Sequence, residues 1–306
     1  MNLNQLILLY DKTRVSRQKS TITDCFHGTV IMKYEVSFYH RNRFENMFEE
    51  QKEWFEKLVK DREDNAKVIE KRSMQGVKKD VVEKYSDSAH FVYELLQNAD
   101  DAKATKCEFV LEKNKLYFSH NGTVRFSVSN PETEEFDADN NALGHINSIT
   151  SVGSSTKENE LSTIGKFGVG FKAVFQYTDT PHIYDENYKF KIIRFVVPEL
   201  LNEDLKFRES NETVFYFPFN KEKMSAEKAY NDILAKLKNL LYPTLFLSNL
   251  QKVLWKTDTN EIGTYRKDVK KTKQNKNILC EKIELLQQIG FEQKEEKLWL
   301  FSRYFE

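Results

Sequence analysis

The sequence has few cysteines, and they are widely separated. Its 306 residues contain three, Cys25, Cys107 and Cys280, and none of them has a neighbour at metal-ligand spacing. This argues against a metal centre built from thiolates. A sparse, odd number of cysteines also fits a reducing compartment.

Neither sign of charge is in excess, and long apolar runs are missing. Lys+Arg and Asp+Glu both number 47, so the formal net charge is zero. This balance argues against a broad nucleic-acid or membrane surface, although a local patch stays possible. The longest early apolar run, residues 6–10, is too short for a signal-peptide core or a membrane span. We therefore expect a cytoplasmic protein, and 40% hydrophobic residues allow a sizeable core.

One segment has the pattern of a helix that carries polar chemistry on one face. In residues 91–102, FVYELLQNADDA, the side chains of Glu94, Asn98 and Asp101 fall at i, i+4 and i+7, which is one helical stripe. Two carboxylates and a carboxamide suit Mg²⁺, which prefers oxygen ligands and keeps several waters. They also suit a general base beside that metal. The plain alternative is a solvated polar face, and a second motif decides against it.

The second motif is a glycine-rich run at residues 164–172, IGKFGVGFK. Its glycines, Gly165, Gly168 and Gly170, allow close approach of a ligand and positive φ. Residues 171–177 are predicted to be helical, so the loop amides would form an anion site at a helix start. The P-loop pattern and the Rossmann fingerprint are both absent. Alone this loop is weak support, but after the polar helix it indicates a phosphate-binding site.

In this order, ELLQNADDA and IGKFGVGFKAVF resemble the N box and the second glycine box of the GHKL ATPases. This family includes gyrase-type topoisomerases, ninety-kilodalton heat-shock chaperones, histidine kinases and MutL. The resemblance is greatest to the chaperone-like branch, and within it to sacsin-type ATP-binding domains. It is clear over residues 88–185 and weaker to about residue 255. It implies a Bergerat fold of the α+β class: a two-layer α/β sandwich with helices on one face of a mixed β-sheet.

The resemblance also implies residue roles. Glu94 would be catalytic and polarise the attacking water, Asn98 would hold Mg²⁺ that bridges the phosphates, and Asp101 would contact the base or ribose side. Thr213 matches a threonine near adenine, although the β-propensity of threonine is an alternative reason for it to begin a strand. The other cofactor-binding positions are Asn121 and Gly122 in a first glycine box; Ser154, Ser155 and Lys157 in a lid; and Gly165, Lys166, Phe167, Gly168, Val169, Gly170, Phe171 and Lys172 in the second glycine box.

Two of these assignments have plain alternatives. The polar segment 150–161, in which the lid residues lie, has a composition that an ordinary surface loop would share. Lys172 would add positive charge near the phosphates, or would equally face solvent.

One position departs from the family pattern. The first glycine box commonly has an aspartate two residues before its glycine, where it accepts a hydrogen bond from the adenine amino group. Here His120 occupies that place. Because a neutral imidazole offers one weaker acceptor, we expect a smaller preference for ATP over GTP, with Asp101 or water taking over the contact.

The chain divides into an N-terminal arm (1–40), a GHKL-type ATP-binding domain (41–255), and a C-terminal extension or the start of another domain (256–306). Apolar residues at helical spacing in 41–71 predict a long amphipathic helix that packs on the core or, less favoured, forms a dimer contact. Strands are predicted at 107–111, 115–119, 182–184, 190–197, 213–219, 245–247, 253–256 and 298–304, helices at 77–85, 142–149, 226–240 and 278–289, and loops at 130–141 and, strongly basic, at 266–276.

The leading hypothesis is Mg²⁺-dependent ATP binding with slow hydrolysis that drives a conformational change. Slow turnover is expected because the family takes a lysine or arginine for the γ-phosphate from a neighbouring domain, and such a cation is worth roughly 10³–10⁵ in rate. The expected partners are ATP and ADP, and a second copy of the chain or further domains of a longer protein. The alternative is an interaction module that binds nucleotide without hydrolysis, against which Glu94 argues. A histidine kinase is disfavoured because no phospho-acceptor helix pair precedes the motifs.

Overall fold

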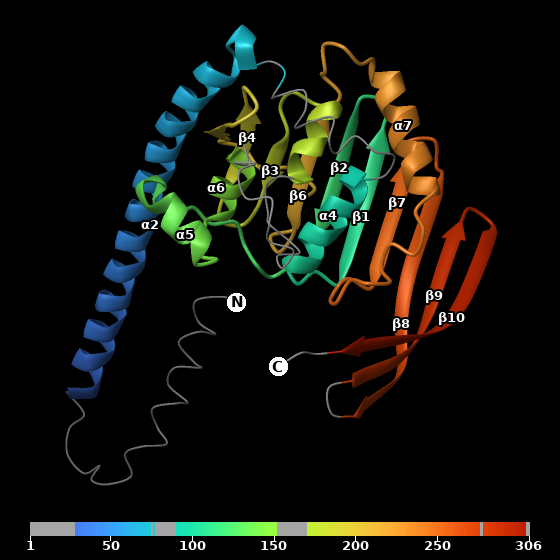
Figure 1. Cartoon of the computed structure of the whole chain (residues 1–306). Coiled ribbons are helices and arrows are strands. Elements are labelled where there is room, and N and C mark those ends of the chain that lie inside the picture. Colours follow the sequence, from blue (N-terminus) through green and yellow to red (C-terminus); the bar gives the residue numbers. More distant parts are fainter. Residues whose placement is uncertain (1–27, 75, 77–89, 152–169, 276–277, 304–306) are drawn as a thin grey trace. The chain divides into compact units, whose positions relative to one another are not determined.

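The computed structural model describes residues 28–74, 76, 90–151, 170–275 and 278–303 (Figure 1). The chain forms two compact units, Met1–Lys52 and Glu53–Glu306. The packing described below belongs to the second unit.

The second unit is organised by one mixed sheet. Its described strands follow the order β10-β9-β8-β7-β1-β2-β6-β3-β4-β5. Strands β1 and β7 pair in parallel, and the other neighbouring pairs are antiparallel. The strands are β1 (Lys106–Glu112), β2 (Lys115–His120), β3 (His182–Tyr184), β4 (Lys189–Ile193), β5 (Val197–Leu200), β6 (Thr213–Pro218), β7 (Lys252–Thr257), β8 (Ile262–Asn275), β9 (Ile278–Ile289) and β10 (Glu292–Arg303).

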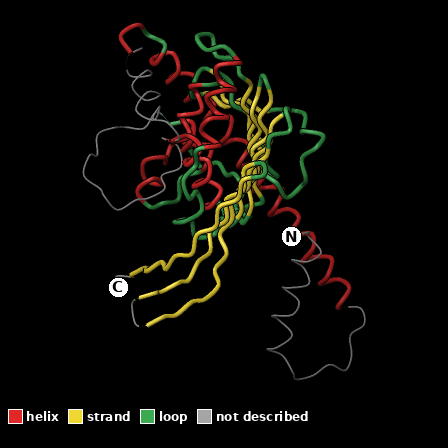
Figure 2. Tube along the Cα trace, turned by 90° about the vertical axis from the view of Figure 1, so that its right-hand side faces the viewer, coloured by secondary structure: helices red, strands yellow, loops and turns green. Residues whose placement is uncertain are grey.

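Helices cover one face of this sheet. Helix α4 (His90–Asp101), helix α6 (His145–Thr150) and helix α7 (Ala226–Lys238) lie on the same side of the strands (Figures 1 and 2). The shorter elements are η1 (Arg72–Met74), η2 (Pro131–Thr133), α5 (Glu134–Asp139) and η3 (Gly170–Gln176). This arrangement confirms the predicted fold class, a two-layer sandwich of helices on a mixed sheet.

The core lies between α4 and the central strands. Leu95 and Leu96 of α4 are completely buried, as are Phe109 of β1 and Phe118 of β2, whose rings lie 4.6 Å apart. Along β1 and β2 buried and part-exposed residues alternate, because successive strand side chains point to opposite faces. The polar stripe of α4 is thereby left at the edge of the core, where the candidate site forms.

Helix α2 (Gly28–Ile69) is longer than predicted. Residues 28–40, which we assigned to the N-terminal arm, are part of it. No glycine or proline interrupts residues 29–69, so the helix continues because propagation costs little once a first turn exists. In the second unit Phe55 and Leu58 are buried, and the Phe55 ring stacks on Tyr188 at 6.0 Å. For this part of the helix core packing is confirmed.

Three predicted elements between residues 130 and 247 differ. The expected loop at 130–141 contains the two short helices η2 and α5. Asn130 caps the start of η2, because its side chain accepts a hydrogen bond from the Glu132 N–H. The expected strand at 190–197 is two strands, because Arg194 and Phe195 have positive φ (51° and 76°) and turn the chain between β4 and β5. Residues 245–247 form turns and not a strand.

The C-terminal region differs most. The basic segment 266–276, predicted as a loop, lies within β8 up to Asn275, and 278–289, predicted as a helix, is strand β9. Long-range pairing decides both, since β8 is hydrogen-bonded to β7 on one side and to β9 on the other. Strand β10 is confirmed and starts earlier than expected. The helix predicted at 77–85 lies outside the described residues.

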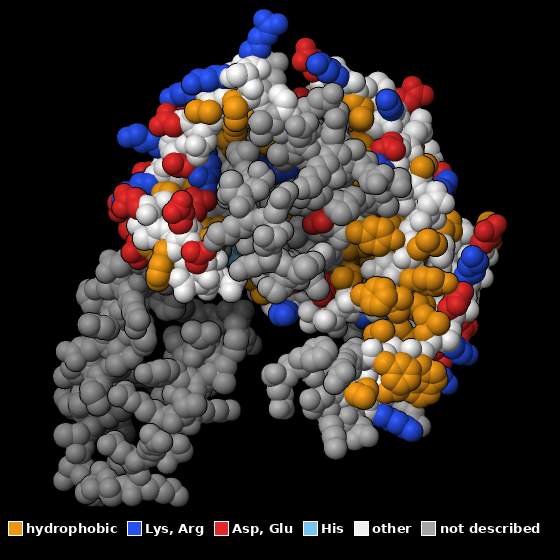
Figure 3. Space-filling model, viewed as in Figure 1, with side chains coloured by type: hydrophobic (Ala, Val, Ile, Leu, Met, Phe, Trp, Pro, Cys, Tyr) orange, Lys and Arg blue, Asp and Glu red, His pale blue; other side chains and the backbone are white. Residues whose placement is uncertain are grey.

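Hydrophobic side chains gather over the part of the surface formed by the 241–246 segment and the outer strands (Figure 3). Leu241, Phe246 and Phe301 are exposed by 75%, 82% and 67%. Across the described chain, no helix combines the length and the apolar character that a membrane crossing requires.

Candidate functional site

The polar stripe of α4 meets the end of the glycine motif. Glu94 is half-buried, and its carboxylate lies directly against the backbone of Gly170, the first residue of η3. A side chain at position 170 would overlap this carboxylate, so the close approach requires glycine. Asn98, one turn further along α4, is 7% exposed. The fold therefore brings together two predicted site residues that are far apart in the sequence.

The two aspartates that end α4 have different environments. Asp100 is buried, and its carboxylate accepts hydrogen bonds from the backbone N–H groups of Ser248, Asn249 and Leu250 at 2.6–3.0 Å. It therefore fixes the chain before β7. Asp101, the predicted site residue, is exposed. Partial burial raises its pKa, and the charges of Asp100 and Glu94 add to the effect.

A small cavity lies between the end of α4 and the sheet. Asn98 and Ala102 line it from the helix, and His120 and Phe215 line it from strands β2 and β6. The rest of the described lining comes from Val124, Arg125, Phe126 and His145. Its walls are mostly apolar, and the Asn98 and His120 side chains are among the few polar groups that line it.

His120 and Gly122 are packed tightly at the end of β2. The Gly122 N–H donates to Nδ1 of His120 at 3.1 Å. A Cβ on Gly122 would lie 2.6 Å from the Ala102 carbonyl oxygen, so this position needs glycine. We expected His120 to offer an acceptor to a base. In this structure Nδ1 accepts from Gly122, and the contact of His120 with a base stays a prediction.

Asn121 faces the neighbouring loop. Its side-chain oxygen accepts from the N–H groups of Thr105 and Lys106 at 3.0 Å, and its amide donates to Thr105 Oγ1 at 3.0 Å. In this structure the Asn121 side chain therefore fixes the backbone at the start of β1. Its predicted contact with a cofactor stays a prediction.

Thr213 belongs to a buried cluster that the sequence did not reveal. It pairs with His120 across β2 and β6, and its hydroxyl donates to Asp185 at 2.7 Å. Asp185 is completely buried and also accepts from the N–H groups of Phe126 and Asn187. The signal for Asp185 was its turn sequence after β3, which is too common to single it out.

Two predicted cofactor-binding residues of η3 belong to the core. Phe171 is 1% exposed, and its ring lies 6.0 Å from that of Phe215. Lys172 is also 1% exposed, and its ammonium donates to the Phe195 carbonyl at 3.0 Å. Burial, and next the charge of Arg62, hold the Lys172 pKa well below its ordinary value. In this structure the Lys172 amine therefore faces the core and not solvent, and a role toward phosphates stays a prediction.

Several predicted positions lie outside the described residues. They are Ser154, Ser155 and Lys157 of the lid, and Gly165, Lys166, Phe167, Gly168 and Val169 of the second glycine box. Their roles stay predictions.

The described residues offer few ligands for a metal ion. No group of three or more His, Cys, Asp or Glu side chains within the described ranges is arranged to hold one. The Asn98 carboxamide in the cavity wall still suits Mg²⁺, which is usually bound by one or two protein oxygens together with phosphates and water.

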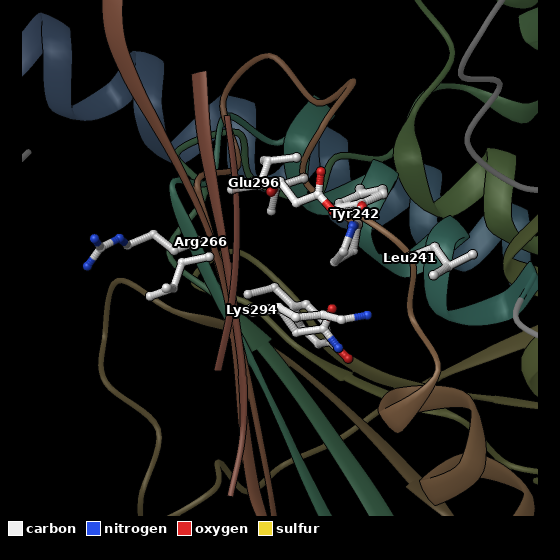
Figure 4. Close-up of a pocket in the computed structure, with 11 residues that line it drawn as sticks. Leu241, Tyr242, Arg266, Lys294 and Glu296 are labelled. Carbon is white, nitrogen blue, oxygen red and sulfur yellow. Dashed lines mark hydrogen bonds between the residues drawn. The ribbon is translucent and has the colours of Figure 1, made fainter. Parts of the chain in front are cut away.

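A second cavity lies away from these residues (Figure 4). Segment 241–244 forms one wall, and strands β8, β9 and β10 form the other. Tyr242 donates to Glu296 at 2.8 Å, while Arg266 extends to the other side of the strands in this view. None of the predicted site residues lines this cavity.

The comparisons with known proteins agree with the motifs. Residues 71–194 match the family model described as the Sacsin domain. The Sacsin-domain match includes α4, His120 and the glycine motif. It covers the stretch in which Glu94 meets Gly170.

Two curated relatives match part of the chain. Human sacsin is 32% identical over 121 residues, which are 36% of this chain and 2% of sacsin. Protein NO VEIN of Arabidopsis thaliana is 34% identical over 114 residues, which are 36% of this chain and 4% of that protein. The chain therefore spans a very small fraction of the length of either relative.

A solved structure matches over a longer stretch. The ATP-binding domain of Francisella tularensis topoisomerase IV, in complex with a small-molecule inhibitor, matches with a TM-score of 0.40 and 17% identity. The match covers 68% of this chain and 62% of that chain.

Proposed function

We propose that this chain binds ATP with Mg²⁺ and hydrolyses it slowly, as a sacsin-like GHKL ATPase domain. The observation that carries the proposal is the contact between the Glu94 carboxylate and the Gly170 backbone. In this proposal Glu94 is the general base, and the contact puts it beside the last glycine of the glycine-rich motif. The match of residues 71–194 to the Sacsin domain adds support.

Each group has a definite task in this proposal. Glu94 takes the proton of the attacking water, and its place against Gly170 keeps it at the loop end. Asn98 contributes a neutral oxygen to Mg²⁺, which would neutralise charge on the phosphates when bound. Phe215 and Ala102 give the cavity apolar surface against which a base would pack.

The nucleotide state would be coupled to a conformational change of the domain. This coupling fits a chaperone-like role within a longer protein or a homodimer, where a second domain supplies a cation. The two described thiols, Cys107 and Cys280, are free, which suits the cytoplasmic location that we propose.

The test is a comparison of phosphate release and ATP binding in the parent chain and in Glu94→Ala. Parent turnover is expected well below the ~10 s⁻¹ typical of enzymes. Loss of the base should lower it by a further factor of about 10²–10⁴, while calorimetry shows ATP still bound. Removal of Mg²⁺ with EDTA should abolish hydrolysis in the parent.

Glu108→Ala is the matched control. Glu108 is a carboxylate on the opposite face of β1, paired with Lys256 at 3.1 Å, and its loss should leave turnover unchanged. Binding without any hydrolysis in the parent would favour the interaction module. Equal turnover in the parent and Glu94→Ala would remove Glu94 from its role.

A further inference from the structure

The outer strands β8, β9 and β10 have two unlike faces. On one face, Tyr265 of β8 donates to the Leu237 carbonyl at 2.7 Å, and Lys267 donates to the Leu247 carbonyl. Both side chains therefore point toward α7 and the turns before β7. Arg266 lies between them in the strand and extends to the other side (Figure 4), because successive strand side chains point to opposite faces. We call the side of Arg266 the outer face.

The strand register shows which residues share the outer face with Arg266. Arg266 lies opposite Leu286 of β9, and directly opposed residues of an antiparallel pair share a face. Lys282, four residues before Leu286, therefore lies on the outer face as well. Its direct neighbours in the register are Lys271 of β8 and Trp299 of β10. The next row on this face consists of Lys273, Cys280 and Phe301.

Two large aromatic side chains of the outer face are exposed. Trp299 is 48% exposed and Phe301 is 67% exposed. They are two residues apart on one strand, so their Cα atoms are separated by about 7 Å along the sheet. Aromatic rings on the surface of a sheet are a platform on which single-stranded nucleic acids stack their bases. Such stacking tolerates any sequence, because every base has a flat face.

The lysines beside these rings carry charge that the described acids do not balance. The ion pairs of the described outer strands involve Arg266, Lys270 and Lys297, and neither Lys273 nor Lys282. The β8 residue opposite Lys282 is itself a lysine. Since like charges at directly opposed positions of a sheet are unfavourable, an anion bound here would be stabilising.

The acids of the outer face are engaged elsewhere. Asp268 and Glu284 both pair with Lys270, at 3.8 and 3.4 Å, and Glu295 pairs with Lys297 at 3.2 Å. These acids lie in the rows toward the other end of the outer strands. Among the described side chains, the two rows that carry the aromatic rings are therefore left positively charged.

We propose that the outer face of β8, β9 and β10 binds single-stranded nucleic acid, with bases stacked on Trp299 and Phe301 and phosphates bound by Lys273 and Lys282. The lysines alone would also suit an anionic lipid surface, whereas the two exposed rings favour a ligand that combines phosphates with flat bases. A duplex keeps its bases in its own stack, so the single strand is the form that fits. The outer face is turned away from α7 and α4, so this binding is separate from the proposed ATPase site (Figure 1).

The experiment is fluorescence anisotropy of the full chain with a labelled oligothymidine of about 12 nucleotides, a length within the range of known single-strand sites. Oligouridine of equal length tests RNA, and binding of either strand supports the proposal, the tighter one identifying the sugar. An abasic strand keeps the phosphates and loses the stacking, so it should bind at least about 10-fold more weakly. Equal affinity for the abasic strand, or no binding of oligothymidine and oligouridine at low salt, would overturn the proposal. This comparison uses the parent protein alone.

Substitutions then separate stacking from charge. Trp299→Ala should weaken binding of oligothymidine by about 10-fold or more at an unchanged salt dependence. Lys282→Ala should instead lower the slope of log affinity against log salt by about 0.7, the contribution of one phosphate contact on a single strand. Phe246→Ala and Lys294→Ala are the matched controls. Phe246 is an exposed ring outside the outer strands, and Lys294 lines the cavity on the opposite face of β10. If the controls weaken binding as much as the outer-face variants, the assignment to this face is wrong.

Two further measurements exclude other binding modes. Saturating ATP with Mg²⁺ should leave the labelled strand bound, because the ATPase site lies on the other side of the sheet. Displacement by ATP would place the strand in the cavity beside Asn98 and overturn the proposal. Phosphatidylserine vesicles that bind the parent chain more tightly than either oligonucleotide, with the binding lost in Trp299→Ala, would assign the outer face to a lipid surface instead.

Discussion

The hairpin β1–β2 and the hairpin β9–β10 are both antiparallel pairs of one sheet, but they meet the rest of the molecule differently. Phe109, Leu111, Leu116 and Phe118 of the inner hairpin are completely buried. In the outer hairpin Ile283 and Leu285 of β9 are buried, while no residue of β10 from 292 to 301 is. Helices pack on one face of the inner strands. They cover the core, and α4 also lines the small cavity. The outer strands are held chiefly by their hydrogen-bond ladders.

The two hairpins therefore contribute to the stability of the fold to different extents. Burial of apolar area is the largest favourable contribution to folding, and it is concentrated under α4 and α7. Around β10 the charged side chains form exposed ion pairs, such as Lys297 with Glu295 at 3.2 Å. Surface pairs of this kind contribute little. Substitutions should therefore matter far more in the inner hairpin than in the outer one.

The sharpest test is the same change in both hairpins. Phe118→Ala should lower the free energy of unfolding by about 3–5 kcal/mol, since it removes a completely buried ring and leaves a cavity. Phe301→Ala should change it by less than about 0.5 kcal/mol, because the ring is 67% exposed. Urea unfolding followed by circular dichroism measures both. A large loss in Phe301→Ala would mean that another surface covers the outer strands in solution.

The same contrast explains what the sequence could predict. Helix α4 and hairpin β1–β2 follow from local periodicity, because one face of each is buried. Strand β9 was predicted as a helix, since the apolar residues of 278–289 do not alternate strictly. Strand β8 was predicted as a basic loop from its composition. Both are strands because of pairing with distant partners, such as Tyr265 with Val253 and Gln287.

The site was predictable only as far as its motifs. The two boxes predicted that Glu94 and Gly170 belong together. No local pattern tells that Lys172 turns into the core toward Phe195, or that Asp185 lies under Thr213. Nor does any local pattern tell that Nδ1 of His120 accepts a hydrogen bond from the Gly122 backbone. Such features arise from tertiary packing and are absent from sequence spacing.

A second test compares two carboxylates changed to their amides. Asp100→Asn should cost about 1–3 kcal/mol, because the new NH₂ group replaces an oxygen that accepts either from the Ser248 N–H or from the N–H groups of Asn249 and Leu250, and leaves that side without an acceptor. Glu284 on β9 pairs with Lys270 at 3.4 Å on the surface. Glu284→Gln should therefore have the same urea midpoint as the parent, both with and without added salt. The comparison fails if Glu284→Gln shifts the midpoint as much as Asp100→Asn does.

The smallest expected effect is a slope with pH, and it compares a buried lysine with an exposed one. The folded chain holds the Lys172 pKa well below its ordinary value, primarily by burial. In the unfolded chain Lys172 is protonated up to about pH 10.4. The unfolded state therefore binds the extra proton, and the free energy of unfolding rises with pH between the two pKa values.

Lys172 should contribute at most about 1.4 kcal/mol per pH unit to this rise. Between pH 7 and pH 8, urea unfolding of Lys172→Met should show a flatter slope than the parent by up to that amount. Subtracting the variant from the parent cancels the histidines and thiols that both proteins share. Lys294→Met on β10 removes an exposed lysine and should keep the parent slope. If Lys172→Met also keeps it, then Lys172 is charged in the folded chain, and water or an anion must reach it beside Phe195.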